Sequence, residues 1–389
     1  MIRALAHQRN RFEALAPAGA SVVSRAGRIL AACVLAGTFA LSAPAAAFAE
    51  VLESDEIGNK TVAARGLSAD ACPDIEATHA MLVGSDGAVY FSRDVNAEVK
   101  IASLTKIMTA VVALENAPLD LTVTVDNEAA TVGESSAGLL EGDTMSLETA
   151  LYALMVPSGN DAGIAIAKSV GAHMSGDAST GYDTFIAAMN AKAADLGMSH
   201  SVYTNPHGLD FDAFGDENLH SSARDVATLV SYAMQNDTFR GIVDAGSTTI
   251  TVTSSDGTAR NVALQTTDEL MGVYDGICGV KTGTTDDAGY CFAGAVSRDA
   301  GEFYSVVLDS PSSDERFSDT VALMDWAYAN IAQRSLVNSD QYVEYLGARV
   351  PLVAKVAHND WVDVTVDATV SDPDLAANVF AAFGPVQAR

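Results

Sequence analysis

Hydrophobic and polar residues alternate in several stretches of the chain, and this period of two predicts β-strands. In residues 79–94, "HAMLVGSDGAVYFSRD", two apolar runs flank a Ser-Asp-Gly turn, so the stretch predicts a β-hairpin. Alternation returns in residues 248–264. Three more short strands are predicted at residues 279–282, 290–296 and 303–308.

Apolar residues recur at helical spacing in the middle of the chain. Residues 144–155 predict a helix, with Ser146 as its cap and Pro157 just beyond its end. In a later predicted helix, residues 221–234, Arg224 and Asp225 are expected to face outward. Further helices are predicted from Ser103 onward, at residues 160–167 and at residues 316–331.

The order of these elements predicts the fold class. Strands come first, then a block of helices, then strands again and a closing helix, so the helical block is inserted into a mainly antiparallel sheet. This is an α+β arrangement with a cleft between its two parts. After about residue 334 the chain changes character, and residues 361–370 alternate again, which predicts a small C-terminal β segment.

The first 49 residues have the pattern of a secretory signal peptide. Arg25 and Arg28 precede a short apolar run, and Ala-Phe-Ala at 47–49 predicts cleavage before Glu50. Residues 50–75 show no sustained period and are expected to be a linker. The expected organisation is therefore a signal peptide (1–49), a linker (50–75), a main domain (76–333) and a small β segment (334–389). No second long apolar segment occurs, so no transmembrane anchor is expected in the mature chain.

Charge excludes some classes of partner. The formal net charge of the 389 residues is −28, and the predicted signal peptide holds five Arg and one Glu, so the mature chain is more acidic still. Nucleic acid and anionic lipid are therefore poor partners. The simplest interpretation of the charge is a solubilising surface on an exported protein.

Three cysteines remain after the predicted signal peptide, which contains Cys33. They are Cys72, Cys278 and Cys291, an odd number, so an oxidising compartment would leave at least one thiol unpaired or in an intermolecular bond. Cys278 and Cys291 flank a predicted hairpin and are the favoured pair, although the sequence leaves the pairing open.

A serine and a lysine three residues apart carry the first chemical signal. In "ASLTKIMTAVV", Ser103 and Lys106 share one face of a helix, so the lysine can reach the hydroxyl. The alternative interpretation is purely structural: Ser103 caps the helix and Lys106 is an ordinary solvated side chain.

Two further motifs occur later in the chain. Ser158-Gly159-Asn160 follows a helix end, and Lys281-Thr282-Gly283-Thr284 ends a strand. Each of these motifs is weak alone, but their order matches the S-x-x-K, S-D-N and K-T-G signature of β-lactamases and penicillin-binding proteins.

The chain also resembles one family over a longer range. The blocks "ASLTKIMTA", "LMVPSGNDAGIAIA", "NPHGLD", "SARDVATLVSYAM" and "GVKTGTTDDAGYCFAGA" are together similar to the D-alanyl-D-alanine carboxypeptidases, the low-molecular-mass penicillin-binding proteins. The resemblance spans roughly residues 76–333. It implies a DD-peptidase/β-lactamase-like fold, with an antiparallel sheet flanked by helices and an inserted helical subdomain. The family usually continues into a full β-domain and an anchoring helix, so how this chain is retained near the wall stays open.

The resemblance also implies roles for the motif residues. Ser103 would be the nucleophile, Lys106 its base and Ser158 a proton relay, and Lys106 would act in its neutral form, favoured by burial and by a nearby cation such as Lys281. The substrate would be held by Asn160, Lys281, Thr282, Gly283 and Thr284. Backbone N–H groups of Ser103 and Thr284 would form the oxyanion hole, and Gly283 would let the strand approach the substrate closely.

Other residues receive no firm role. His207, in a Pro-His-Gly sequence, is interpreted as part of a structural turn, and Arg316 is left open as a surface residue at the start of the last helix. The chain has no H-E-x-x-H motif and no Gly-rich phosphate loop after a strand, so neither a metal nor a cofactor is expected.

The activity implied by the resemblance is a serine-type carboxypeptidase. It would remove the terminal D-alanine of peptidoglycan stem peptides through an acyl-enzyme at Ser103, in the cell envelope, with β-lactams as covalent inhibitors. A β-lactamase is the alternative enzyme and a non-catalytic wall-binding homologue the alternative of another class. The Glu-x-x-Leu-Asn motif that serves deacylation in class A β-lactamases is missing from "HSVYTNPHGLD", and the nearest glutamate, Glu217, lacks the motif.

Overall fold

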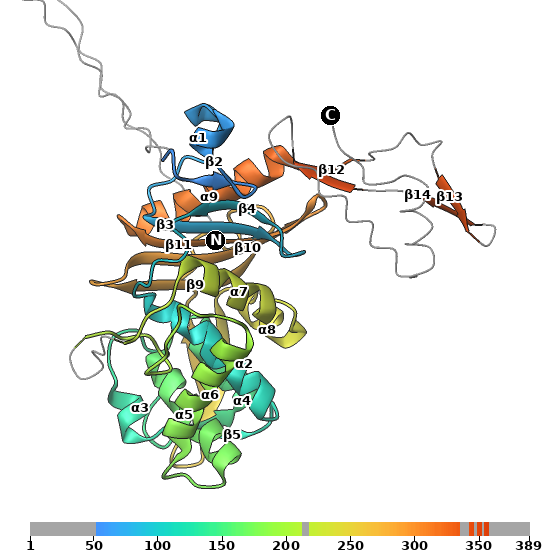
Figure 1. Cartoon of the computed structure of the whole chain (residues 1–389). Coiled ribbons are helices and arrows are strands. Elements are labelled where there is room, and N and C mark those ends of the chain that lie inside the picture. Colours follow the sequence, from blue (N-terminus) through green and yellow to red (C-terminus); the bar gives the residue numbers. More distant parts are fainter. Residues whose placement is uncertain (1–51, 212–217, 335–341, 346–347, 352–353, 358–389) are drawn as a thin grey trace, which may run out of the picture. The chain divides into compact units, whose positions relative to one another are not determined.

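A seven-stranded antiparallel sheet forms the centre of the described part of the chain (Figure 1). The computed structural model describes residues 52–211, 218–334, 342–345, 348–351 and 354–357. The strand order is β2-β1-β4-β3-β11-β10-β9. Their bounds are β1 Glu56–Ile57, β2 Lys60–Thr61, β3 His79–Gly84, β4 Val89–Arg93, β9 Ile277–Thr285, β10 Gly289–Arg298 and β11 Gly301–Ser310.

The sheet is buried on both faces, because helices cover each of them. Along β3, Met81 belongs to one apolar core, whereas its neighbour Leu82 belongs to the other. Helix α9 (Ser313–Asn330) packs on β10 and β11 at the second core, and helix α7 (Ala223–Ala233) packs on β3 and β11 at the first. Double coverage explains why the central strands are continuous apolar runs. The predicted α+β class with an antiparallel sheet is confirmed.

A helical region lies between β4 and β9 in the sequence and contains a second, four-stranded sheet in the order β5-β6-β7-β8. Helices α2 and α5 pack on each other at its centre, and α5 also contacts α3, α4 and α6. The bounds of these elements are η2 Ala102–Leu104, α2 Thr105–Asn116, β5 Thr122–Thr124, α3 Asn127–Thr131, β6 Thr144–Ser146, α4 Leu147–Met155, α5 Asn160–Ser175, α6 Gly181–Asp195, α8 Asp237–Val243, β7 Thr248–Thr253 and β8 Ala259–Leu264.

Three expectations about local structure were wrong. The segment predicted to be a linker forms β1, β2, α1 (Val62–Arg65) and η1 (Ala69–Ala71), and β1 extends the sheet by pairing with β4. The predicted helix 144–155 begins only at Leu147, because residues 144–146 form strand β6; Ser146 does cap it, accepting from Thr149 N. Asp225 faces inward, where its carboxylate accepts hydrogen bonds from His200 N and Ser201 Oγ.

The favoured disulfide is also absent. Cys72, Cys278 and Cys291 are all free thiols. Cys291 on β10 stands opposite Gly283 on β9, so the two cysteines of the expected pair lie five positions apart along the ladder. At about 3.3 Å per residue this is roughly 16 Å, well beyond the roughly 7 Å limit between the Cα atoms of a disulfide.

The described C-terminal residues form two short antiparallel pairs. Strand β12 (Ile331–Arg334) pairs with β15 (Ala354–Ala357), and β13 (Tyr342–Tyr345) pairs with β14 (Ala348–Pro351). The predicted signal peptide, the predicted strand 361–370 and Glu217 lie outside the described residues. Among the residues that are described, no helix is both long and apolar enough to cross a membrane.

Candidate active site

Ser103 lies in the short helix η2, which leads directly into α2. The preceding residue, Ala102, has a positive φ of 47°, a conformation that costs energy for a residue with a side chain. Lys106 lies one turn further on, and its Nζ is 2.7 Å from Ser103 Oγ. The predicted pair is therefore in direct contact.

Lys106 is fully buried, and its Nζ makes three close contacts. Two of them are acceptors only: Asn160 Oδ1 at 2.7 Å and the His207 carbonyl oxygen at 2.9 Å. Burial, and secondarily the charge of Lys281, hold the pKa of Lys106 well below its usual value. A neutral amine has two N–H groups, which these two acceptors use, and one lone pair, which is then directed to the Ser103 hydroxyl proton. The contacts thus suit a lysine that acts as a base.

The second wall of the site comes from the junction of α4 and α5. Ser158 has a positive φ of 64° and is 4% exposed, and Asn160 is the first residue of α5. Ser158 Oγ has no hydrogen-bond partner within the described part of the chain. Asn160 accepts from Lys106 with its side-chain oxygen and donates from Nδ2 to the Gly133 carbonyl, so it fixes both Lys106 and a neighbouring loop.

That loop, residues 133–139, is fixed by Asp161. The buried Asp161 carboxylate accepts hydrogen bonds from Ser136 Oγ and from the backbone N–H groups of residues 137, 138 and 139. Ala162 N also donates to Asp161 Oδ1, so five donors converge on one buried carboxylate and form a strong local network. The loop that carries Glu134 and Ser135 to the mouth of the site is therefore rigidly anchored.

Strand β9 forms the facing wall. Thr282 Oγ1 is hydrogen-bonded to Thr267 Oγ1 at 2.6 Å, and Lys281 Nζ donates to the Thr282 carbonyl at 2.8 Å. Burial, and then the charge of Arg316, lower the pKa of Lys281 to about 7. Thr284 Oγ1 donates to the Gly283 carbonyl and accepts from Arg316 Nη1 at 2.9 Å.

Two glycines allow the backbone around Ser103 to pack closely. A Cβ on Gly283 would lie 2.8 Å from the Ile101 carbonyl oxygen and 3.2 Å from Ser103 N. A Cβ on Gly208, whose φ is +90°, would lie 1.9 Å from the Ala102 carbonyl oxygen. Gly283 is thus required first for the close contact between β9 and the segment Ile101–Ser103. The expected close approach of β9 to the substrate at Gly283 stays a prediction.

A cleft of about 680 Å³ lies between the two walls. Every predicted site residue lines it except Lys106 and Lys281, which are buried and contact residues of its lining. The other lining residues are Glu134, Ser135, Leu209, Asp210, Phe211, Thr267, Thr285, Asp286, Asp287 and Arg316. No group of His, Cys, Asp and Glu suited to a metal ion occurs within the described ranges.

Arg316 is a site residue that the sequence left open. It is 7% exposed at the start of α9, and it reaches β9 to donate to Thr284 Oγ1. An arginine at the start of a helix that follows a strand gives no signal of this contact, since it depends on how α9 packs on the sheet.

His207 contributes its backbone to the site. Its carbonyl accepts from Lys106, and its Nδ1 accepts from Leu209 N at 3.2 Å, in the turn after Pro206. Burial, and then the charge of Lys106, lower the pKa of the imidazole to about 3, so it is neutral at ordinary pH. The eight predicted site residues therefore lie at one cleft: six line it, Lys106 and Lys281 are buried behind the lining, and the His207 carbonyl accepts from Lys106.

Comparison with known proteins is consistent with this geometry. Residues 66–312 match the D-alanyl-D-alanine carboxypeptidase peptidase family. A D-alanyl-D-alanine carboxypeptidase of a Streptomyces strain is 32% identical over 250 residues, which cover 62% of this chain and 84% of the relative. DacF of Bacillus subtilis is 28% identical over 308 residues, which cover 77% of this chain and 71% of the relative.

Solved structures of D-alanyl-D-alanine peptidases also match this chain. The crystal structure of the Streptomyces DD-transpeptidase matches with a TM-score of 0.62 and 30% identity, covering 66% of this chain and 98% of that chain. A D-alanyl-D-alanine carboxypeptidase from Mycobacterium tuberculosis matches with a TM-score of 0.57 and 29% identity, covering 69% of this chain and 94% of that chain. The chain belongs to the D-alanyl-D-alanine carboxypeptidase family of serine peptidases.

Proposed function

We propose that this chain is an exported carboxypeptidase that removes the terminal D-alanine from peptidoglycan stem peptides, with Ser103 as its nucleophile. The observation that carries the proposal is the contact between Lys106 Nζ and Ser103 Oγ, with both N–H groups of the neutral amine used by Asn160 and the His207 carbonyl. A serine hydroxyl becomes an effective nucleophile when an adjacent base takes its proton.

Acylation would proceed in two steps. Ser103 Oγ attacks the carbonyl carbon of the scissile peptide bond and passes its proton to Lys106, which gives a tetrahedral intermediate. The N–H groups of Ser103 and Thr284 stabilise the oxyanion, whose charge exists only in and near the transition state. The C–N bond then breaks, and Ser158 relays a proton to the departing amine of D-alanine. Water later hydrolyses the ester and restores the Ser103 hydroxyl.

Recognition of the chain end would depend on positive charge. Lys281 and Arg316 lie at the Thr282–Thr284 part of β9, where a terminal carboxylate would bind together with the threonine hydroxyls. Beyond Thr284 the cleft lining continues to Thr285 at the end of β9 and to Asp286 and Asp287 in the turn that follows. Asn160 would hold the substrate amide.

The activity is tested with diacetyl-Lys-D-Ala-D-Ala. We expect the purified protein to release D-alanine from this peptide, and Ser103→Ala to release none. Failure of the parent protein to release D-alanine, while it still forms a penicillin adduct, would contradict the carboxypeptidase assignment.

The β-lactamase alternative is tested with nitrocefin. We expect a burst of about one equivalent per enzyme followed by near silence, because the ring-opened drug keeps its leaving group tethered and the region "HSVYTNPHGLD" lacks the Glu-x-x-Leu-Asn motif that supplies the deacylation glutamate of class A β-lactamases. Absence of such a base typically costs a factor on the order of 100 to 10,000. Sustained turnover near roughly 10 per second would favour a β-lactamase.

Export to the cell envelope is part of the same proposal. The apolar run after Arg28 and the Ala-Phe-Ala sequence at 47–49 support a cleaved signal peptide. Mass spectrometry of the protein secreted by its cell should give Glu50 as the N-terminal residue. A role in cell-wall biogenesis and cell shape would follow from the substrate.

A further inference from the structure

Asp210 is a buried acid in the lining of the cleft, and the proposed mechanism gives it no role. It is 8% exposed, and its Oδ2 accepts a hydrogen bond from Thr285 Oγ1 at 2.7 Å. Thr285 is the last residue of β9 and also lines the cleft. Its Oγ1 in turn accepts from Ala288 N at 3.0 Å, in the turn that leads to β10. The carboxylate is thus bonded to the end of the strand that carries Thr284.

The segment before Asp210 is a turn that its own side chains close. Asn205 Oδ1 accepts hydrogen bonds from the N–H groups of residues 207 and 208, and Asn205 Nδ2 donates to the carbonyl of residue 209. The N–H of residue 209 donates to His207 Nδ1. These groups are all buried, so the bonds hold the turn in one conformation up to Asp210.

The same turn is fastened to α2, the helix that carries Lys106. Thr109 Oγ1 on α2 donates to the Pro206 carbonyl at 2.7 Å, and Lys106 Nζ donates to the His207 carbonyl at 2.9 Å. One rigid turn therefore contacts the proposed base on one side and, through Asp210, the end of β9 on the other.

The end of β9 needs such a link because the proposed oxyanion hole takes its two N–H groups from separate segments. Ser103 lies in η2, whereas Thr284 lies on β9, the last strand of the central sheet, which pairs only with β10 among the described strands. The hole is complete only while the end of β9 keeps its place relative to η2. A displacement of about 1 Å in a catalytic site can cost roughly 100-fold in rate.

We propose that Asp210 is a positioning residue for the oxyanion hole: through its hydrogen bond to Thr285, it holds the end of β9 so that Thr284 N–H stays aligned with Ser103 N–H. The proposal rests on the function proposed above. Loss of the bond would misalign the donor and leave it in the site, because Arg316 still binds Thr284 Oγ1 and β10 still pairs with β9.

The first measurement compares kcat and KM for diacetyl-Lys-D-Ala-D-Ala, and the rate of acylation by benzylpenicillin, in Asp210→Ala and Asp210→Asn. For Asp210→Ala we expect acylation and kcat to fall about 10- to 100-fold, less than the roughly 100- to 1,000-fold typical of removing an oxyanion-hole donor outright. KM should stay within about twofold, because the oxyanion forms only in and near the transition state. Asparagine keeps an acceptor oxygen, so Asp210→Asn should stay within about threefold of the parent.

The second measurement reports on the oxyanion hole itself. Benzylpenicillin labelled with ¹³C at the β-lactam carbonyl gives an acyl-enzyme whose ester C=O stretch is visible in an infrared difference spectrum. Hydrogen bonds from the hole polarise this carbonyl and lower its frequency, so the band should lie at higher wavenumber in Asp210→Ala than in the parent and in Asp210→Asn. A merely structural residue would lower the melting temperature and leave the band of the folded acyl-enzyme where it is.

Thr285→Val tests the same bond from its other end, and it keeps the proposal testable if Asp210→Ala does not fold. It should show the same loss in kcat and the same shift of the band, and the double variant should be no slower than the slower single variant, within about twofold. Independent effects would instead multiply.

Asp256→Ala is the matched control. Asp256 Oδ1 accepts from Thr258 Oγ1 at 2.6 Å in the turn between β7 and β8, so it removes the same kind of bond from an exposed turn outside the cleft lining. Its acylation rate should match that of the parent within about twofold. An equal loss in Asp256→Ala, a loss in Asp210→Asn as large as in Asp210→Ala, or an unshifted carbonyl band would overturn the proposal. If the parent itself reacts with neither penicillin nor peptide, the proposed function fails instead.

Discussion

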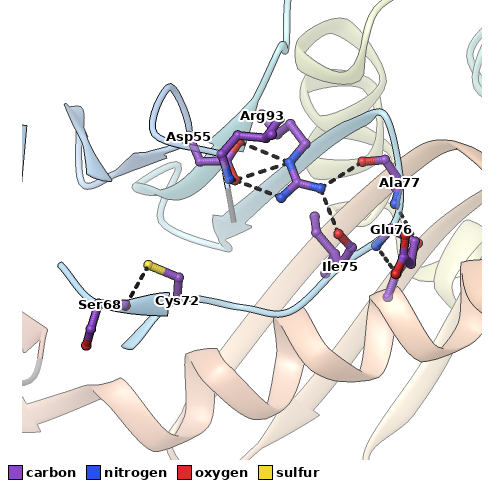
Figure 2. Close-up of polar contacts among 9 residues, drawn as sticks. Asp55, Ser68, Cys72, Ile75, Glu76, Ala77 and Arg93 are labelled. Carbon is purple, nitrogen blue, oxygen red and sulfur yellow. Dashed lines mark hydrogen bonds and ion pairs between the residues drawn. The ribbon is translucent and has the colours of Figure 1, made fainter. Parts of the chain in front are cut away.

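Two buried polar clusters lie in different parts of this molecule, and they differ in how completely their groups are paired. In the first, Arg93 donates to both oxygens of Asp55 and to the carbonyls of Ile75 and Ala77, as Figure 2 shows. Asp319 accepts from the N–H groups of residues 76 and 77 and from Ser310 Oγ. This cluster fastens the N-terminal segment to the sheet.

The second cluster surrounds Lys106 and Lys281 at the cleft. Here Ser158 Oγ, Asp268 Oδ2 and Arg316 Nε have no partner among the described residues, and Ala102 and Ser158 have positive φ angles. Strain and unpaired polar groups persist only where surrounding structure holds them, and they gather at functional sites. In this molecule the cluster that fastens the N-terminal segment is fully paired, whereas the groups at the cleft keep unused hydrogen-bonding capacity.

The largest expected effect is on the second cluster. Ser103→Ala should abolish covalent labelling by a fluorescent penicillin, a loss of at least about 10,000-fold, because the hydroxyl is the proposed attacking group. Its melting temperature should match that of the parent. A variant that labels as well as the parent would show that the nucleophile is another residue.

Lys106→Arg should come next, with acylation roughly 1,000-fold slower, since arginine stays charged and cannot take the serine proton. In the parent, burial lowers the pKa of Lys106, so the neutral base is present above that pKa and is lost as the pH falls through it. Acylation rates measured from neutral to acidic pH should therefore decline. A flat profile would count against a neutral lysine base.

A substitution in the first cluster should change the free energy of unfolding and leave penicillin labelling unchanged. Asp55→Asn leaves the Arg93 charge buried without its anion and should lower the free energy of unfolding by about 3–5 kcal/mol, measured by urea denaturation. Penicillin labelling of the folded protein should be unchanged. Glu128→Gln is the control, because it removes one partner of the exposed Lys168 pair and should cost less than about 1 kcal/mol. Equal costs for the two variants would contradict the distinction.

The sequence predicted the parts of the molecule that local patterns determine. The hairpin at residues 79–94 corresponds to β3 and β4, and the three later predicted strands correspond to β9, β10 and β11, although each of these three is longer than expected. The segment from residue 52 to 75 was missed because its order comes from distant partners, such as Arg93 and the Trp326 indole, which donates to the Ala71 carbonyl. Residues 144–146 were assigned to a helix because Met145 fits both periods.

The residues of the site also fall into two groups: those that local sequence patterns predict and those that only tertiary packing brings to the cleft. Ser103, Lys106 and the later motif residues stand out because their spacing along the chain reflects the chemistry. Arg316 and Thr267 do not, since they reach β9 from α9 and from the loop after β8, and only tertiary packing brings them there. Asp225 was placed on the surface for a similar reason, as its partners lie in a separate segment.

The smallest expected effect concerns the thiols, which take no part in the hydrogen bonds described for either cluster. Cys278 donates to the Ala295 carbonyl and Cys291 to the Ala288 carbonyl, and burial raises the pKa of both thiols, to about 11 for Cys278 and about 12 for Cys291. The thiolate is the reactive form, so both cysteines should resist oxidation at neutral pH.

Treatment with dithiothreitol should then leave the melting temperature and penicillin labelling unchanged. Alkylation of the unreduced, denatured protein followed by peptide mapping should find Cys72, Cys278 and Cys291 all modified, and a disulfide-linked peptide containing any of the three would show that the oxidised protein departs from this arrangement.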